Sequence, residues 1–366
     1  MTDIPLVDLK AAHAEVADEV DRGFRRVLTD AVYVGGPEVS AFEQEYAAFC
    51  GVPHCIGVAN GTDALELALR ALDVGPGREV ILPANTFIAT AEAVARTGAR
   101  PVLVDCDPAS YLIDVDAALA AITPATAAIV PVHLYGQLAP VERLAAAGVP
   151  IVEDAAQAQG ATRHGRAAGT TGIAGTSFYP GKNLGAYGDA GAVVTVDARI
   201  ADAVRTTANH GSRARYVHEI VGCNSRLDAL QAVVLRVKLS RLARWNEARQ
   251  RAAARYDELL ARVDVVRPRV LPGNTHVWHL YVVRITGGRR DRVRQRLAAA
   301  GVAAGIHYPV PVHLTPAFAH LGHPIGAFPH AEAAAAEIIS LPLHPHLSAD
   351  DQEYTVKALD VALTDG

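Results

Sequence analysis

Short apolar runs recur through the first half of the chain, each about as long as a buried strand. They lie at residues 54–58, 79–83, 101–105, 127–132, 150–154, 175–179 and 191–196. Most lack the alternation of apolar and polar residues that marks a strand with one solvent-exposed face, so they predict strands that are buried on both faces. Segments of helical period lie between most of them, at residues 63–72, 88–97, 115–121, 141–147 and 198–208. This order predicts an α/β domain with a mostly parallel, seven-stranded sheet.

The pattern changes near Leu227, where an amphipathic stretch begins that reaches about Val263 and predicts one helix or two in sequence. A β-branched and aromatic run then predicts a strand over residues 277–285, followed by a helix over 291–300, a short strand over 302–306 and two terminal helices. We therefore predict a large domain over residues 1–240 and a smaller C-terminal α/β domain over residues 241–366.

Composition excludes several classes of protein. A net charge of -5 over 366 residues offers no basic excess for binding nucleic acid. The 4 cysteines form no C-x-x-C pair, which fits a reducing compartment, and no histidine spacing matches a zinc site, so we predict no metal. The start MTDIPLVDLK has no basic segment followed by an apolar run, and no run of about 18 apolar residues occurs. We expect a cytoplasmic protein with no membrane span.

Candidate chemistry lies where the predicted strands end, because ligands of open α/β sheets bind at the carboxyl ends of strands. After the first strand, Gly61 lets the backbone approach a ligand, and Thr62 or Asp63 can cap the next helix, whose free amides suit an anion. A simple capped turn would use the same residues. Phe87, at another strand end, could stack on a cofactor ring or fill the core under a loop.

Two further strand ends carry ionisable groups. Asp154 ends the run 150–154 and could keep a pyridinium nitrogen protonated, or could cap the next helix. Lys182 lies in a loop flanked by Pro and Gly, five residues after Ser177, which could meet a phosphate oxygen. A single loop lysine is usually solvated, so the interpretation depends on the order of a phosphate turn, a strand-end acid and a lysine. That order predicts pyridoxal 5′-phosphate (PLP) held as a Schiff base on Lys182.

Seven motifs, in order along nearly the whole chain, resemble the DegT/DnrJ/EryC1/StrS family of PLP-dependent nucleotide-sugar aminotransferases. They are PANTFIATAEAV, PVHLYGQ, VEDAAQAQGA, SFYPGKNLGAYGDAG, NHGS, GCNSRLDALQA and IHYPVPVH. The resemblance implies the aspartate-aminotransferase fold, known as fold type I. Ala190 stands where many relatives have Gly. The presence of Lys182 separates this chain from the branch that carries His there and dehydrates sugars.

The resemblance implies a role for each matching residue. Lys182 would carry the cofactor and then act as a base, Asp154 would pair with the pyridine nitrogen, Gln157 would lie near the ring and its 3′-oxygen, and Phe87 would stack on the ring.

It also implies how the phosphate is held. Gly61, Thr62 and Ser177 would bind the phosphate, and Asn224 would reach the phosphate of the neighbouring subunit's cofactor. The unit would then be a homodimer with shared active sites.

The reaction implied has two halves. L-glutamate would give its amine to PLP and leave as 2-oxoglutarate, and pyridoxamine 5′-phosphate would pass the amine to a ketone of a nucleotide-linked sugar. Residues 210–228 resemble members that aminate the 3-keto position of dTDP-deoxysugars, and Tyr187, His307 and Tyr308 are candidate sugar contacts.

Other functions stay open at this point. Within the family they are a 4-keto sugar aminotransferase and a keto-inositol aminotransferase. A PLP-binding regulatory protein is a further alternative, against which the intact Lys182, Asp154 and Gln157 argue. A dinucleotide-binding oxidoreductase is excluded because no G-x-G-x-x-G turn follows the first strand.

Overall fold

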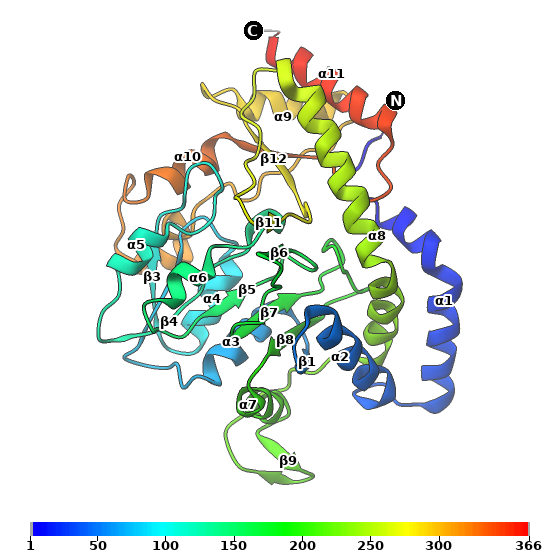
Figure 1. Cartoon of the computed structure of the whole chain (residues 1–366), viewed down its shortest axis with the longest axis vertical. Helices are drawn as coiled ribbons and strands as arrows, with labels where there is room; N and C mark the ends of the chain where they lie inside the picture. Colours follow the sequence, from blue (N-terminus) through cyan, green and yellow to red (C-terminus); the bar gives the residue numbers. More distant parts are fainter. Residues whose placement is uncertain (1–2, 365–366) are drawn as a thin grey trace.

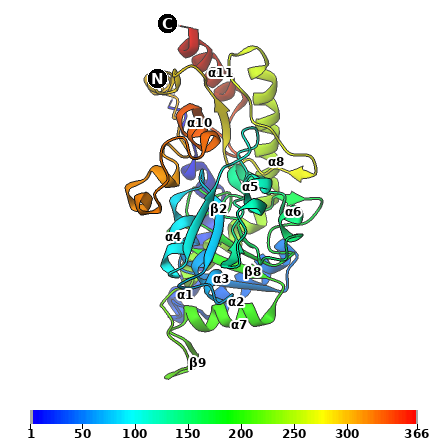
Figure 2. The same cartoon turned by 90° about the vertical axis from the view of Figure 1, so that its left-hand side faces the viewer.

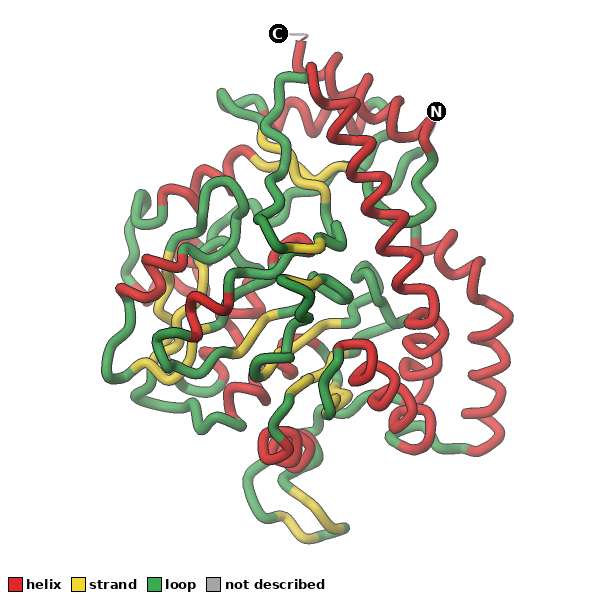
Figure 3. Tube along the Cα trace, viewed as in Figure 1, coloured by secondary structure: helices red, strands yellow, loops and turns green. Residues whose placement is uncertain are grey.

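The computed structural model describes residues 3–364 of the chain. Strands occupy the middle of the molecule, and helices cover both sides (Figures 1 and 3). The two ends of the chain lie at the same end of the molecule in two perpendicular views (Figures 1 and 2). None of the helices within the described residues is long and apolar enough to cross a membrane.

The central strands form two hydrogen-bonded sheets. One has the order β1 (His54–Val58), β8 (Gly191–Thr195), β7 (Ile173–Ser177), β5 (Val152–Asp154), and the other has the order β3 (Arg100–Val104), β2 (Glu79–Pro83), β4 (Thr126–Ile129). Isolated parallel bridges, Ile129 to Ile151 and Val132 to Asp154, lie between the two sheets. The predicted α/β class is confirmed, whereas a single seven-stranded sheet is not.

Strand β8 makes the arrangement mixed, because it is the antiparallel strand among the seven central strands. It runs antiparallel to both β1 and β7, while β2 pairs in parallel with β3 and β4, and β5 with β7. The connection from β7 to β8, residues 178–190, contains no helix. An antiparallel pair can be joined by a short return, whereas a parallel pair needs a long crossover. This return is the loop that carries Lys182.

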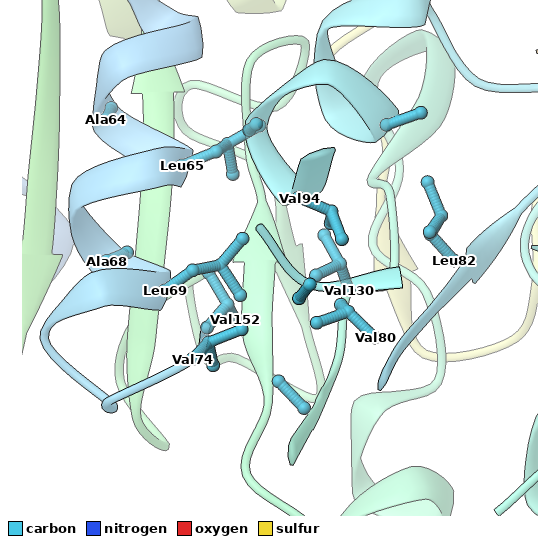
Figure 4. Close-up of a cluster of buried hydrophobic side chains, with 14 of the residues drawn as sticks. Ala64, Leu65, Ala68, Leu69, Val74, Val80, Leu82, Val94, Val130 and Val152 are labelled. Atoms are coloured by element: carbon cyan, nitrogen blue, oxygen red, sulfur yellow. The ribbon is translucent and has the colours of Figure 1, made fainter. Parts of the chain in front are cut away.

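Five short helices connect the strands. They are α3 (Gly61–Arg70), α4 (Ile88–Arg96), α5 (Val115–Ala120), α6 (Val141–Ala145) and α7 (Ala198–Ala208), close to the predicted segments. Helix α3 begins after Asn60, whose Oδ1 accepts from the Asp63 amide at 2.8 Å. Leu65 and Leu69 of α3 point toward Val152 and its neighbours in a buried cluster (Figure 4). Packing of this apolar face fixes the start of α3 beside the strand ends.

Three longer helices lie along one side of the molecule (Figure 1). The sequence patterns predicted α8 (Ala229–Leu259) but neither α1 (Leu9–Asp30) nor α2 (Gly36–Cys50). Helix α8 is one continuous helix that buries Leu235, Leu242 and Trp245, and Glu15 of α1 forms an ion pair with its Arg244. The predicted domain boundary near residue 240 falls inside α8 and stays a prediction.

The C-terminal part holds the antiparallel pair β12 (Tyr281–Arg284) and β13 (Ile338–Leu341), with α9 (Arg290–Ala299), α10 (Pro329–Glu337) and α11 (Ala349–Thr364). The predicted strand over 302–306 is wrong, because Val302 and Gly305 make only isolated bridges. Strand β13 was not predicted.

Short elements complete the fold. They are β6 (Thr162–Arg163), which pairs with β11 (Asn274–Thr275), a hairpin of β9 (Ser212–Ala214) and β10 (Val217–His218), and the 3₁₀ turns η1 (Leu134–Gly136), η2 (Leu260–Arg262), η3 (Val312–Leu314) and η4 (Pro316–Leu321). The hairpin projects from the end of the molecule opposite the termini (Figures 1 and 2).

Candidate active site

One pocket of about 400 Å³ gathers most of the predicted site residues. It lies where β5 and β7 end and where α3 and α4 begin. The predicted residues that line it are Gly61, Thr62, Phe87, Asp154, Gln157, Ser177, Lys182, His307 and Tyr308. The fold therefore brings together residues that are up to 247 positions apart, from Gly61 to Tyr308.

Lys182 lies on the return between β7 and β8. Its backbone amide donates to the Tyr179 carbonyl oxygen at 2.8 Å. The loop then folds so tightly that a Cβ on Gly185 would lie 2.3 Å from the Pro180 oxygen, which makes glycine necessary there. Burial lowers the pKa of the Lys182 amine to about 8, although the nearby Asp154 acts in the opposite direction. A neutral, nucleophilic amine is thus accessible close to neutral pH.

Asp154 ends β5 and is buried at the pocket wall. Its Oδ2 accepts a hydrogen bond from the Thr90 hydroxyl at 2.7 Å, and its Oδ1 accepts from the Ala156 amide at 3.1 Å. The Thr86 hydroxyl lies 2.7 Å from that of Thr90. These donors hold the carboxylate in one orientation. Thr90 was not predicted, although it follows Phe87 by three residues, nearly one helical turn.

Gln157 and two aromatic rings form another part of the wall. The Gln157 Oε1 accepts from the Tyr135 amide at 2.6 Å, and its Nε2 donates to the Tyr308 hydroxyl at 3.0 Å. The Phe87 ring lies 5.0 Å from the Tyr308 ring, centroid to centroid, with 51% of Phe87 exposed. Burial raises the pKa of Tyr308, so its phenol stays neutral and keeps a proton to donate.

The first turn of α3 meets the end of β7. A Cβ on Gly61 would lie 2.6 Å from the Cβ of Ser177, so only glycine fits. The first amides of a helix, here those of Gly61 and Thr62, have no partner within the helix and point at whatever lies before it. The Ser177 hydroxyl oxygen accepts from the Tyr179 amide at 3.2 Å, which orients it. This is a site for an anion such as a phosphate.

The pocket therefore fits the cofactor that the sequence indicated. A primary amine, an ionisable carboxylate, an aromatic face and an anion site are the four groups that a phosphorylated pyridine aldehyde requires, and all four face the same cavity. Among the described residues, no group of three or more His, Cys, Asp or Glu side chains is arranged to hold a metal ion.

A sequence model of the DegT/DnrJ/EryC1/StrS aminotransferase family matches residues 15–360. The chain belongs to this family. The prediction of the family, and of an aminotransferase, is confirmed.

Two curated relatives extend over nearly the whole of this aminotransferase. One, 48% identical over 94% of the chain and 92% of its own length, is the dTDP-3-amino-3,4,6-trideoxy-alpha-D-glucose transaminase of Streptomyces venezuelae. Another, 49% identical over 98% of the chain and 99% of its own length, is named erythromycin biosynthesis sensory transduction protein EryC1, from Saccharopolyspora erythraea.

Solved structures share the whole fold. The DesV protein of S. venezuelae, in complex with a ketimine intermediate, superposes with a TM-score of 0.97 at 45% identity, and the match covers 100% of both chains. The Spr1654 protein of Streptococcus pneumoniae, in its PLP form, has a TM-score of 0.90 at 26% identity, covering 99% of this chain and 98% of that one. The type I fold of the aminotransferase is therefore confirmed.

Two predicted site residues lie outside the pocket of their own chain. The Tyr187 hydroxyl lies 2.6 Å from the His13 Nδ1, and its ring centroid lies 4.5 Å from the Lys238 Nζ. Asn224 is exposed and pairs through its backbone with Asn209. The sugar contact of Tyr187 and the cross-subunit contact of Asn224 stay predictions.

Sequence reasoning missed several pocket residues. Besides Thr90, the wall includes Thr86, Tyr179, Asp189 and His279. Of the predicted histidines, His307 has its Nδ1 2.8 Å from the Ser340 hydroxyl, and burial with the nearby Lys182 lowers its pKa to about 4. It therefore faces the pocket as a neutral imidazole.

Proposed function

We propose that this aminotransferase moves an amino group from L-glutamate to the 3-keto group of a dTDP-linked deoxysugar, in the biosynthesis of an amino sugar. It would do so as a cytoplasmic homodimer with shared active sites. The observation that carries the proposal is that the Lys182 amine and the Asp154 carboxylate face one pocket, at the end of which α3 begins.

The cofactor is pyridoxal 5′-phosphate, which supplies an electron sink for the carbon from which a proton is removed. Lys182 would hold it covalently, with Asp154 against its ring nitrogen. Gly61, Thr62 and Ser177 would bind its phosphate.

The protein's own residues would then direct the proton. When it is no longer bonded to the cofactor, the Lys182 amine can take a proton and return it at a neighbouring atom, because its pKa is lowered to about 8. Asp154 cannot turn away, because Thr90 and Ala156 hold both of its oxygens. The Phe87 ring would cover the face of the cofactor. Holding these groups in register is the protein's main contribution to the rate.

The substrate is inferred from the relatives and from the pocket. The S. venezuelae relative is named as a transaminase of a dTDP-linked 3-amino sugar. The neutral His307 and the Tyr308 phenol offer hydrogen bonds to sugar hydroxyls.

The test is the visible absorbance of the purified protein. L-glutamate should remove the band of the bound cofactor and release 2-oxoglutarate, and a dTDP-linked 3-keto deoxysugar should restore the band. Lys182→Ala is the control and should show neither change. A wild-type protein whose band does not respond to any amino acid would contradict the proposal. Product NMR separates a 3-amino from a 4-amino sugar, and a keto-inositol serves as the competing acceptor.

A further inference from the structure

His279 lines the pocket that contains Lys182 and lies in the segment between β11 and β12. The proposed reaction steps do not use it. It is 8% exposed, so its ring nitrogens depend on the protein for partners. Its Nδ1 lies 3.2 Å from the Oδ1 of Asn183, the residue that follows Lys182.

A chain of side-chain amides determines which His279 nitrogen carries the hydrogen. The Val277 carbonyl oxygen can only accept, so the Asn183 atom at 2.9 Å from it must be the amide nitrogen. The second hydrogen of that nitrogen goes to the Asn246 Oδ1 at 2.9 Å. The Asn246 amide is itself oriented, because its Nδ2 donates to the Gln159 carbonyl oxygen at 2.9 Å.

The Asn183 oxygen therefore faces the His279 Nδ1, which must donate to it. The hydrogen of the neutral ring then lies on Nδ1, and Nε2 carries a lone pair. No hydrogen bond among residues 3–364 uses this Nε2.

Burial keeps the ring neutral. It is the main cause that lowers the pKa of His279 well below its ordinary value, and positive charge nearby adds to it. The cationic groups concerned are Lys182 and Arg249. The imidazole thus stays an acceptor at neutral pH.

We propose that His279 contacts the acceptor substrate, with its Nε2 accepting a hydrogen bond from a hydroxyl of the nucleotide-linked sugar. This inference rests on the proposed function. The carboxylates of L-glutamate have no hydrogen to donate at neutral pH, and its amine has to reach the cofactor. A sugar hydroxyl is a donor that a lone pair in this wall fits. Asn183 is the positioning residue that aims the lone pair.

The test compares binding of two probes by isothermal titration calorimetry. The protein is the holoenzyme in its pyridoxamine phosphate form, which cannot react with an amine. The probes are dTDP and dTDP-3-amino-3,4,6-trideoxy-alpha-D-glucose. We expect His279→Phe to weaken the sugar probe about tenfold, the effect of one hydrogen bond, and to leave dTDP unchanged. The matched control is His276→Phe: His276 is also buried but bonds to the Trp278 amide and lies outside the pocket.

A second variant tests the aiming of the lone pair. In Asn183→Ala, the His279 Nδ1 loses the oxygen that accepts its hydrogen, so the hydrogen can move to Nε2, which then no longer accepts. Affinity of this variant for the sugar probe should drop about tenfold, whereas its affinity for dTDP should stay unchanged. The nitrogen-15 shifts of the His279 ring report which nitrogen carries the hydrogen, and loss of a residue with only a structural role would leave them unchanged.

The outcomes distinguish a failure of the inference on His279 from a failure of the proposed dTDP-sugar substrate. Equal affinity of wild type and His279→Phe for the sugar probe, or the same nitrogen-15 shifts of the His279 ring in wild type and Asn183→Ala, would overturn the inference alone. A wild-type protein that binds neither probe would overturn the proposed dTDP-sugar substrate, and the inference with it. Cofactor absorbance and the unfolding midpoint identify a variant that has misfolded, in which case the other variant decides.

Discussion

Lys238 of α8 donates a hydrogen bond from its Nζ to the carbonyl oxygen of Gly185, 2.7 Å away. Gly185 lies three residues after Lys182, so a buried lysine of the long helix holds the loop of the cofactor lysine in place. The same Nζ lies 4.5 Å from the centroid of the Tyr187 ring, which attracts a cation. Burial lowers the pKa of Lys238 from 10.5 to about 8.

This pKa gives stability a measurable pH dependence. Between its folded and unfolded pKa values, Lys238 binds fewer protons in the folded state, so the free energy of unfolding should rise with pH in that window. In Lys238→Met the rise should be smaller, by on the order of 2 kcal/mol between about pH 8 and about pH 10. Urea denaturation of both proteins at several pH values checks this. The contribution of Lys182 cancels in the comparison, and parallel curves would show that Lys238 is not the group responsible.

Asp154→Asn should keep the hydrogen bonds from Thr90 and Ala156 but lose the negative charge. Without that charge the ring nitrogen is not held protonated, so the half-reaction with L-glutamate should slow by at least about a hundredfold, while part of the cofactor stays bound. Stopped-flow absorbance measures the rate, and the absorbance per subunit gives the occupancy. An unchanged rate would remove Asp154 from its proposed place.

Thr90 should act through Asp154. Thr90→Val removes the hydroxyl that donates to Asp154 at 2.7 Å and keeps the side-chain volume. We expect kcat to fall about tenfold with little change in the KM for L-glutamate, because one hydrogen bond to a charged group is lost. Thr90→Ser restores the hydroxyl and should restore most of the rate. If Ser and Val behave alike, the threonine contributes packing rather than orientation.

Gly61→Ala should weaken cofactor binding. The new Cβ would lie 2.6 Å from the Ser177 Cβ and would push apart the turn proposed to hold the phosphate. We expect PLP to bind at least about tenfold more weakly, in line with the strain of overpacking. Gly75→Ala is the matched control, since its Cβ would meet only the Thr97 oxygen, at 3.8 Å. Fluorescence titration of the cofactor-free proteins with PLP gives both affinities.

Asn224→Ala should speed the loss of cofactor. Asn224 is exposed and lies outside the pocket of its own chain, and its proposed contact is with the cofactor of a partner subunit. Dialysis followed by absorbance measures retention, with Asn209→Ala as the control, because Asn209 is also exposed. Equal retention in both variants would count against the cross-subunit contact.

Several features were predictable because they depend on neighbours in the sequence. The apolar run before Asp154 is a buried strand, so the position of this acid at a strand end follows from local pattern. The same holds for Gly61 at the start of α3 and for Ser177 at the end of β7. The family motifs then indicated what these strand ends bind.

Other features were decided by contacts that no local pattern records. The run 191–196 reads the same for a parallel or an antiparallel strand, and only pairing with β1 and β7 sets its direction. Tyr187 has the aromatic ring expected of a sugar contact, yet it packs against Lys238, which lies 51 residues further on.

By itself the sequence determined the fold class, the order of the strand ends and the residue types that the cofactor needs, because periodicity and turn chemistry act over short distances. Only the tertiary structure decided which of these residues share a cavity and in which state they face it. The lone pair of His279 shows why. Its direction is set by Asn183, which lies 96 positions from His279 in the chain. Asn183 is in turn oriented by Asn246, 63 positions from Asn183. Hydrogen-bond partners at such separations exist only once the chain has folded.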